Sequence, residues 1–249
     1  GMQTSGKKLP GAYGANEPKQ NAANLRTKGW ELMLTWNDAF KLANKPFRYN
    51  LSVGLADNTS EITKFDNPSK ILSDYYVGQK LGDIWGYVVD GLFRTDEEAA
   101  NYNVDQTAVN FVINTAQVNP GLHAGDMKFV DLDGNNKISS GSNTADDPGD
   151  RKIIGNSLPR YTYSIQGGFD WYGFDFSIYL QGVGHQDWYP GTNSVFFWGP
   201  YARPYSSFIP RDFLSNVWSP ENPDAYFPRM RGYAAQGDRS LAKVNDRYL

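Results

Sequence analysis

Residues 161–184 decide the fold, and they read YTYSIQGGFDWYGFDFSIYLQGVG. Apolar side chains alternate with polar or small ones on both sides of Tyr172-Gly173. A period of two places successive side chains on opposite faces of an extended strand. The stretch therefore predicts an antiparallel hairpin with one apolar face and one polar face. The apolar face would hold Tyr161, Tyr163, Ile165, Phe169, Trp171, Phe174, Phe176, Ile178 and Leu180.

Residues 29–56 repeat this alternation and predict a second hairpin. The connector between its two strands is expected at 38–46. The apolar members before it are Trp30, Leu32, Leu34 and Trp36, and those after it are Phe47, Tyr49, Leu51, Val53 and Leu55.

Two architectures fit these hairpins. An outer-membrane barrel has strands of about ten residues, an apolar outside, a polar lumen and aromatic girdles. A soluble β-sandwich with one buried face gives the same alternation. The connections favour the barrel, because 57–160 and 185–249 are far longer than a compact sandwich uses, whereas outer-membrane barrels alternate short turns with long loops. We therefore predict an all-β chain: a partial antiparallel transmembrane β-barrel of about four long strands in two hairpins.

The long loops are expected to be ordered and to contain short helices. Thr95, followed by three acidic residues, is a favourable helix start. Residues 108–116 and 210–218 are further candidates. The two predicted hairpins would have to bury their apolar faces by packing face to face or across protomers.

Composition excludes several functions. The net charge is -3, so the chain lacks the basic surface of a nucleic-acid-binding protein. It contains no cysteine, two histidines and no nucleophile-elbow or zinc-protease motif, so no enzyme signature is present. Aromatic residues make up 15% of the chain, which by itself indicates a large core or a sugar-binding surface.

An acidic loop predicts a cation site. Oxygen ligands at positions 1, 3 and 5 of a tight loop converge on one point, as calcium requires. Asp131, Asp133 and Asn135 occupy these positions, and Lys137 would offer its backbone carbonyl. Ile138 is expected to pack inward. The alternative is an Asx-rich surface turn that binds no metal.

The loop departs from the EF-hand pattern in two places. Asn136 stands where glycine is usual, and Ser142 stands where a glutamate would close the site. Asp150 could supply the late carboxylate if 140–149 bulges out as an insertion, with Asp146 and Asp147 as rivals.

A dense group of aromatic residues follows the second hairpin. Such rings stack on sugars or anchor a protein partner, but they equally form the private core that a long loop needs. The candidates for contact with substrate or partner are Trp188, Tyr189, Phe197, Trp198 and Tyr201.

An ordered set of short motifs then becomes recognisable. The chain resembles the C-terminal half of SusC/RagA-type TonB-linked outer-membrane proteins of Bacteroidetes. The motifs that carry this resemblance are NAANLRTKGWEL at 21–32, GYVVDGLF at 86–93, GDMKFVD at 125–131, DRKIIGN at 150–156, PRYTY at 159–163, GFD at 173–175, QGVG at 181–184 and WSPENP at 218–223.

The resemblance implies import, not catalysis. It implies an outer-membrane location, a SusD-like surface lipoprotein as partner, and uptake of oligosaccharides or peptides driven by TonB through an N-terminal part absent from this chain. Two other readings stay open: a soluble secreted β-sandwich that binds glycans with a structural calcium, and a surface glycosidase. The expected organisation is a leading segment at 1–28, a first barrel hairpin at 29–56, a long extracellular loop region with the acidic loop at 57–160, a second hairpin at 161–184 and a late extracellular loop region at 185–249.

Overall fold

The structure is a computed structural model that describes residues 2–5, 14, 19–109, 121–191, 194–201, 209–230 and 243–249. Most of the regular structure is antiparallel strand, so the chain is all-β as predicted. Among the described residues, no helix is both long and apolar enough to cross a membrane.

The chain divides into two compact units. The first, which we call the sheet unit, comprises Gly1–Pro68, Asp74–Gly82 and Asn156–Asp187. The second, which we call the loop unit, comprises Ser69–Ser73, Asp83–Gly155 and Trp188–Leu249.

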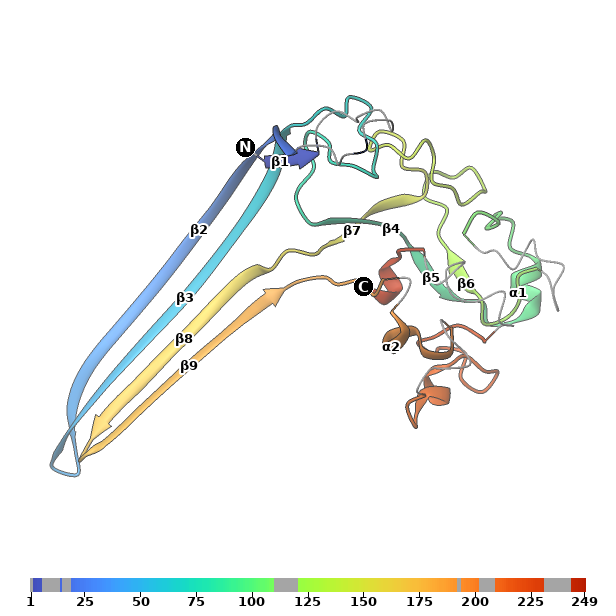
Figure 1. The fold of residues 1–249 in the computed structure, drawn as a ribbon. Helices are drawn as coiled ribbons and strands as arrows, with labels where there is room; N and C mark the ends of the chain where they lie inside the picture. The colour runs from blue at the N-terminus through green and yellow to red at the C-terminus, as the bar shows by residue number, and fades with distance from the viewer. Residues whose placement is uncertain are drawn as a thin grey trace. The chain divides into compact units, whose positions relative to one another are not determined.

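The described strands of the sheet unit form one five-stranded sheet of order β1-β2-β3-β8-β9, in which neighbours are antiparallel (Figure 1). Pairing of β3 with β8 joins the two hairpins edge to edge. The strands are β1 (Met2–Ser5), β2 (Lys19–Leu42), β3 (Lys45–Lys64), β8 (Arg160–Trp171) and β9 (Phe174–His185). This pairing corrects the expectation that the hairpins pack face to face, because the described strands of this unit lie side by side in one sheet.

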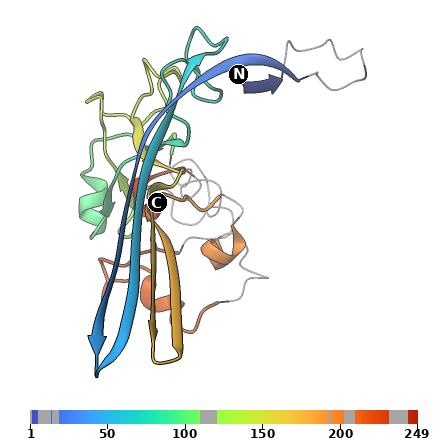
Figure 2. The ribbon, with the colours of Figure 1, turned by 90° about the vertical axis from the view of Figure 1, so that its left-hand side faces the viewer.

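Both hairpins turn over two residues at the same end of the sheet (Figure 2). Ala43 and Asn44 have φ angles of 48° and 62°, and Tyr172 and Gly173 have 51° and 84°. Positive φ at both central residues produces the twist that matches antiparallel strands. The predicted connector at 38–46 was therefore wrong, because the strands continue on both sides until this tight turn.

The register confirms the two-faced pattern. Residues that pair directly across strands share a face, so the alternation within each strand becomes rows across the sheet. One apolar row holds Leu34, Val53, Ile165 and Leu180, and the next row, on the opposite face, holds Thr35, Ser52, Gln166 and Tyr179.

The apolar face is exposed in this chain. Leu34 and Trp36 are each 62% exposed, and Phe174 is 69% exposed. Next to the hairpin turns this face carries rings in contact, with centroids 5.0 to 5.4 Å apart. They run from Phe40 through Phe47 and Phe169 to Phe176. We call these four the turn-side aromatic row, and Trp30 lies on the same face toward the other end of β2.

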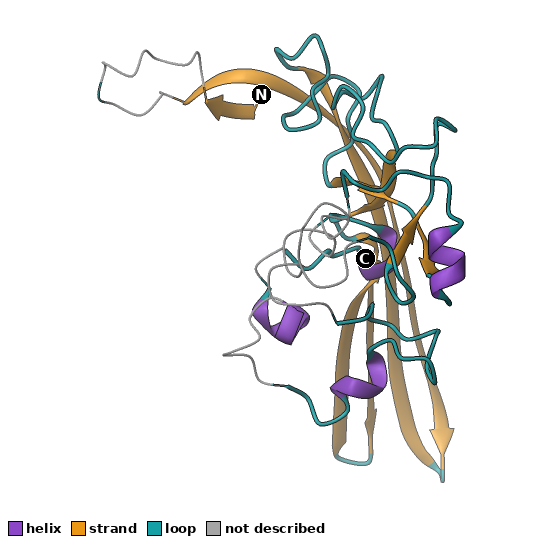
Figure 3. Ribbon diagram, turned by 90° about the vertical axis from the view of Figure 1, so that its right-hand side faces the viewer, coloured by secondary structure: helices purple, strands orange, loops and turns teal. Residues whose placement is uncertain are grey.

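The loop unit is built from short elements around its own core (Figure 3). Its strands are β4 (Asp83–Tyr87) paired with β7 (Arg151–Asn156), and β5 (Val89–Leu92) paired with β6 (Met127–Phe129). Its helices are α1 (Asp96–Ala100), α2 (Val195–Trp198) and the 3-10 turns Gly199–Tyr201, Phe213–Asn216 and Asp246–Tyr248.

The first expected helix is present. Thr95 caps α1, and its side chain accepts a hydrogen bond from the backbone N–H of Glu98 at 3.1 Å. The candidate at 210–218 is shorter than expected, a 3-10 turn over Phe213–Asn216. The candidate at 108–116 lies mostly outside the described residues.

Aromatic rings form the centre of the loop unit. Buried core residues include Phe129, Ile138, Trp198, Tyr201 and Tyr248, contributed by segments far apart in the sequence. This core holds together a region in which regular secondary structure is scarce.

Candidate functional site

The acidic loop connects β6 to β7 in the loop unit. Asp131 is half-buried, Asp133 is exposed and Asp150 is fully buried. One carboxylate oxygen from each of the three lies within 4.8 Å of the others. The structure therefore brings together the first, third and late carboxylates that the sequence singled out.

Backbone N–H groups hold two of these carboxylates in place. The Asp131 carboxylate accepts from the N–H groups of Gly134 and Asn136, each at 2.8 Å. The Asp150 carboxylate accepts from Leu132 at 2.8 Å and from Ser139 at 2.7 Å. Asp150 therefore ties the start of the loop to its end, which is why it is buried.

The insertion between Ser139 and Asp150 closes on itself, because the N–H of Asp150 donates to the carbonyl of Ser139 at 3.0 Å. The rival carboxylates point elsewhere. Asp146 pairs with Lys70 at 2.8 Å, and Asp147 accepts from the N–H of Ser142 at 2.9 Å.

The remaining two predicted ligands lie in the same loop. The side-chain amide of Asn135 donates to Asp133 at 2.9 Å. Lys137 forms a short parallel bridge with Asp105, and the next residue, Ile138, packs into the core as expected. Asn136 takes the left-handed conformation, with φ 60°, in the place where a glycine is usual.

Electrostatics in the loop favour a cation. Partial burial acts to raise the pKa of Asp131, but three backbone N–H donors outweigh it and hold that pKa below its ordinary value. The pKa of Asp133 is raised by desolvation and by the negative charges of Asp150 and Asp131. A hard cation would relieve this repulsion, and an all-oxygen donor set is the one that calcium takes.

The five candidate contact aromatics divide into two groups. Trp198 and Tyr201 are each 2% exposed, and their rings pack in the loop-unit core. Tyr189 and Phe197 are half-buried against the same core. Only Trp188, at 64% exposed, presents its ring to the surface. Most of the group therefore forms the core that a long loop region needs, and a contact role stays a prediction for Trp188.

Hydrogen bonding fixes two of these rings. The hydroxyl of Tyr189 donates to the carbonyl of Lys243 at 3.1 Å, and the hydroxyl of Tyr201 donates to the carbonyl of Pro228. Burial raises the pKa of both phenols, so they stay neutral hydrogen-bond donors at physiological pH.

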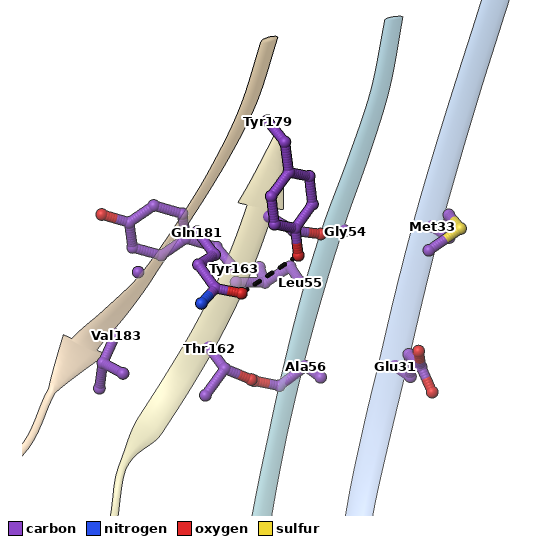
Figure 4. A pocket seen from close by; sticks show the side chains of 12 residues that line it. Glu31, Met33, Gly54, Leu55, Ala56, Thr162, Tyr163, Tyr179, Gln181 and Val183 are labelled. Atoms are coloured by element: carbon purple, nitrogen blue, oxygen red, sulfur yellow. Dashed lines mark hydrogen bonds between the residues drawn. The ribbon is translucent and has the colours of Figure 1, made fainter. Parts of the chain in front are cut away.

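A hollow on the polar face of the sheet unit was not foreseen from the sequence. It has a volume of about 480 Å³ and lies across the four long strands (Figure 4). Tyr179 was the available signal, because it is the one aromatic residue in the series of alternate residues Asp175, Ser177, Tyr179, Gln181 and Val183 of β9.

Comparison with known proteins supports the resemblance. No family model matches the chain. Three TonB-dependent receptors of Formosa agariphila are similar: P39 is 26% identical over 68% of this chain, P3 is 23% identical over 70%, and P26 is 22% identical over 92%. The chain spans about a fifth of the length of these relatives: 18%, 16% and 21%, respectively. The chain is therefore similar in sequence to TonB-dependent receptors, and its all-β fold agrees with that similarity.

Proposed function

We propose that this chain is a wall segment and an extracellular loop region of a TonB-dependent importer of oligosaccharides or peptides. One observation carries the proposal: a continuous apolar sheet face that stays exposed on four paired strands. In water such an exposed apolar face would promote aggregation, whereas the lipid-facing outside of a membrane barrel must be apolar.

The height of the apolar face fits a bilayer. Ten residues separate Trp30 from Phe40 of the turn-side aromatic row. At about 3.3 Å per residue this is about 33 Å along the strand, or about 25 Å of height at a tilt of about 40°. The apolar band of outer-membrane barrels is also about 25 Å tall and is bounded by aromatic girdles.

The connections agree with an outer-membrane orientation. The two hairpin turns have two residues each, whereas about 95 residues separate Lys64 at the end of β3 from Arg160 at the start of β8. Short turns face the periplasm and long loops face outward in such barrels. The loop unit would then lie on the outside of the cell.

In this proposal the acidic loop binds calcium as a structural cation. Asp131, Asp133 and Asp150 would be its carboxylate ligands, with Asn135 and the carbonyl of Lys137 completing the oxygen set. Calcium supplies positive charge to this cluster, and the chain's own residues hold the loop closed through the buried Asp150. The cation would stiffen the loop unit and take no part in catalysis, and we assign no enzymatic activity to this chain.

The SusC-type features of the sequence extend the proposal to partners. A SusD-like surface lipoprotein would dock on the outward loops, and TonB would drive uptake through the receptor. The similarity to proteins named TonB-dependent receptors supports TonB-driven uptake. The motifs that resemble those of SusC-type proteins support a SusD-like lipoprotein as the partner.

Uptake tests the proposal directly. In the organism that carries the gene, its deletion should abolish entry of at least one labelled oligosaccharide or peptide, and the restored gene should recover it. A proton uncoupler should stop the same uptake, because TonB action needs the proton gradient. Unchanged uptake of every compound after deletion would refute the proposal.

A further inference from the structure

The hollow on the polar face is a trough with a floor of small residues. The floor comes from the two central strands, with Gly54 and Ala56 of β3 beside Thr162 and Ser164 of β8. A Cβ atom at position 54 would lie 2.8 Å from Ser164 Oγ, so any larger residue there would clash with Ser164 in the floor.

Larger side chains from the outer strands form the walls. Glu31 and Met33 stand on β2, and Tyr179 and Gln181 stand on β9 (Figure 4). Three strand spacings separate β2 from β9, which gives a width of about 14 Å. The volume of about 480 Å³ lies within the range of small-ligand sites, about 300–1,000 Å³.

Tyr179 is the most informative wall residue. On the polar face of β2 from Gly29 onward, and of β3, β8 and β9, it is the single Phe, Tyr or Trp that the register places there. Tyr179 is 60% exposed, so it is not part of a core of this chain. Its hydroxyl donates to Gln181 Oε1 at 3.2 Å, which positions the ring and the amide side by side.

We infer that this trough binds a neutral oligosaccharide, with Tyr179 stacking on a sugar ring and Gln181 and Glu31 hydrogen bonding its hydroxyl groups. The C–H face of a pyranose is weakly positive and packs on the negative face of an aromatic ring. Amide, carboxylate and hydroxyl side chains suit the sugar's hydroxyl groups, each of which both donates and accepts.

The sheet itself disfavours a peptide in this place. An extended peptide binds by adding a strand to an open edge, where backbone groups are free. The floor strands β3 and β8 are both paired on each side, so their backbone groups already take part in the ladder. Recognition in the trough must therefore come from side chains. Glu31 is the one charged side chain in the lining, and it would repel anionic sugars.

The inference rests on the proposed function, which makes the polar face a lumen. Met33 lies seven residues from Phe40, or about 23 Å along the strand, but three residues from Trp30, or about 10 Å. The trough would then lie in the outer half of the wall, where an incoming substrate arrives first.

Binding by the intact receptor in detergent tests the inference. Maltohexaose, cellohexaose, xylohexaose and mannohexaose are titrated by calorimetry, and the best binder is carried forward. Loss of one stacked ring in Tyr179→Ala should weaken its binding about three- to tenfold. Tyr179→Phe keeps the ring and should stay within about twofold. Tyr172→Ala removes an equally exposed ring at the hairpin turn and should leave affinity unchanged.

Two outcomes would overturn the inference. Either no hexasaccharide binds at millimolar concentration, or Tyr179→Ala binds as tightly as the native receptor. If Tyr179→Ala instead lowers the unfolding temperature without changing affinity, another part of the receptor fills the trough and the inference is again wrong. Uptake by cells with and without the gene is measured in parallel. If uptake depends on the gene but Tyr179→Ala does not weaken binding, the proposed import function holds and only the assignment of the trough is wrong.

Discussion

A charge placed on the apolar face should destabilise the barrel according to its depth in the bilayer. Leu34 is the residue to change, because it is 62% exposed and lies between the two aromatic levels. It is six residues from Phe40 and four from Trp30, or about 20 Å and about 13 Å along the strand. This places Leu34→Arg close to the middle of the apolar band.

The expected cost follows from that depth. An arginine on the lipid face at the midplane costs about 2–4 kcal/mol, falling to about 0–1 kcal/mol near the interface. The ratio of folded to unfolded receptor should therefore fall by about 30-fold to several hundred-fold for Leu34→Arg. Leu42→Arg, beside the hairpin turn, should cost about 1 kcal/mol or less.

Thr35 provides the matched control, because it follows Leu34 directly and lies on the opposite face. Its hydroxyl is 3.0 Å from that of Ser52 at an exposed position. Thr35→Arg should lower the free energy of unfolding by about 1 kcal/mol or less, since it breaks one exposed hydrogen bond and places its charge on the polar face.

Urea unfolding of the intact receptor in phosphatidylcholine vesicles, followed by tryptophan fluorescence, measures all three variants. Equal losses for Leu34→Arg and Thr35→Arg would refute the assignment of the two faces. Equal losses for Leu34→Arg and Leu42→Arg would show that the apolar face packs on protein, because only a bilayer makes the cost depend on depth.

Three further predictions concern the loop unit. Calcium should raise the unfolding temperature of the intact receptor, and Asp131→Ala should remove this effect while Asp146→Asn keeps it; no effect of calcium on the native receptor would exclude the site. Without calcium, Asp133→Asn should stabilise the fold at pH 7, because the raised pKa of Asp133 means that the fold disfavours its ionised form. This gain should vanish in a pH series of unfolding temperatures as the native carboxyl becomes protonated, and a gain that persists at low pH would contradict it. Ile138→Ala should destabilise the loop unit by about 2–5 kcal/mol, whereas Leu132→Ala, 41% exposed, should change stability by about 0.5 kcal/mol or less; similar losses in chemical unfolding would contradict the core assignment.

The strands could be predicted because their signal is local. Alternation from Trp30 to Trp36 and from Tyr161 to Trp171 is visible within a few residues, and the register preserves it. The first turn could not be located, because alanine rarely adopts the positive φ of Ala43 and the Asn-Gly signal of such turns is missing.

The acidic loop was partly predictable for a similar reason. Asp131 and Asp133 belong to one short motif, but Asp150 lies beyond an insertion, and its role depended on how that insertion closes. The aromatic candidates were less predictable. Nothing periodic in the sequence distinguishes the exposed Trp188 from the buried Trp198, because which ring turns inward depends on core partners far away in the chain.

The register that produces the apolar wall also determines where Tyr179 can act. Its neighbours Ile178 and Leu180 occupy the apolar face, so Tyr179 must point to the opposite side, and a slip of one residue would exchange every side chain of the strand between the two faces. Tyr179 therefore cannot join the aromatic girdle, and at 60% exposure it is not part of a core of this chain. Among the described residues, many aromatic rings lie either on the apolar face of the sheet or in the loop-unit core, and Tyr179 belongs to neither group. Since neither lipid contact nor core packing accounts for this ring, contact with a ligand is the role that its position supports.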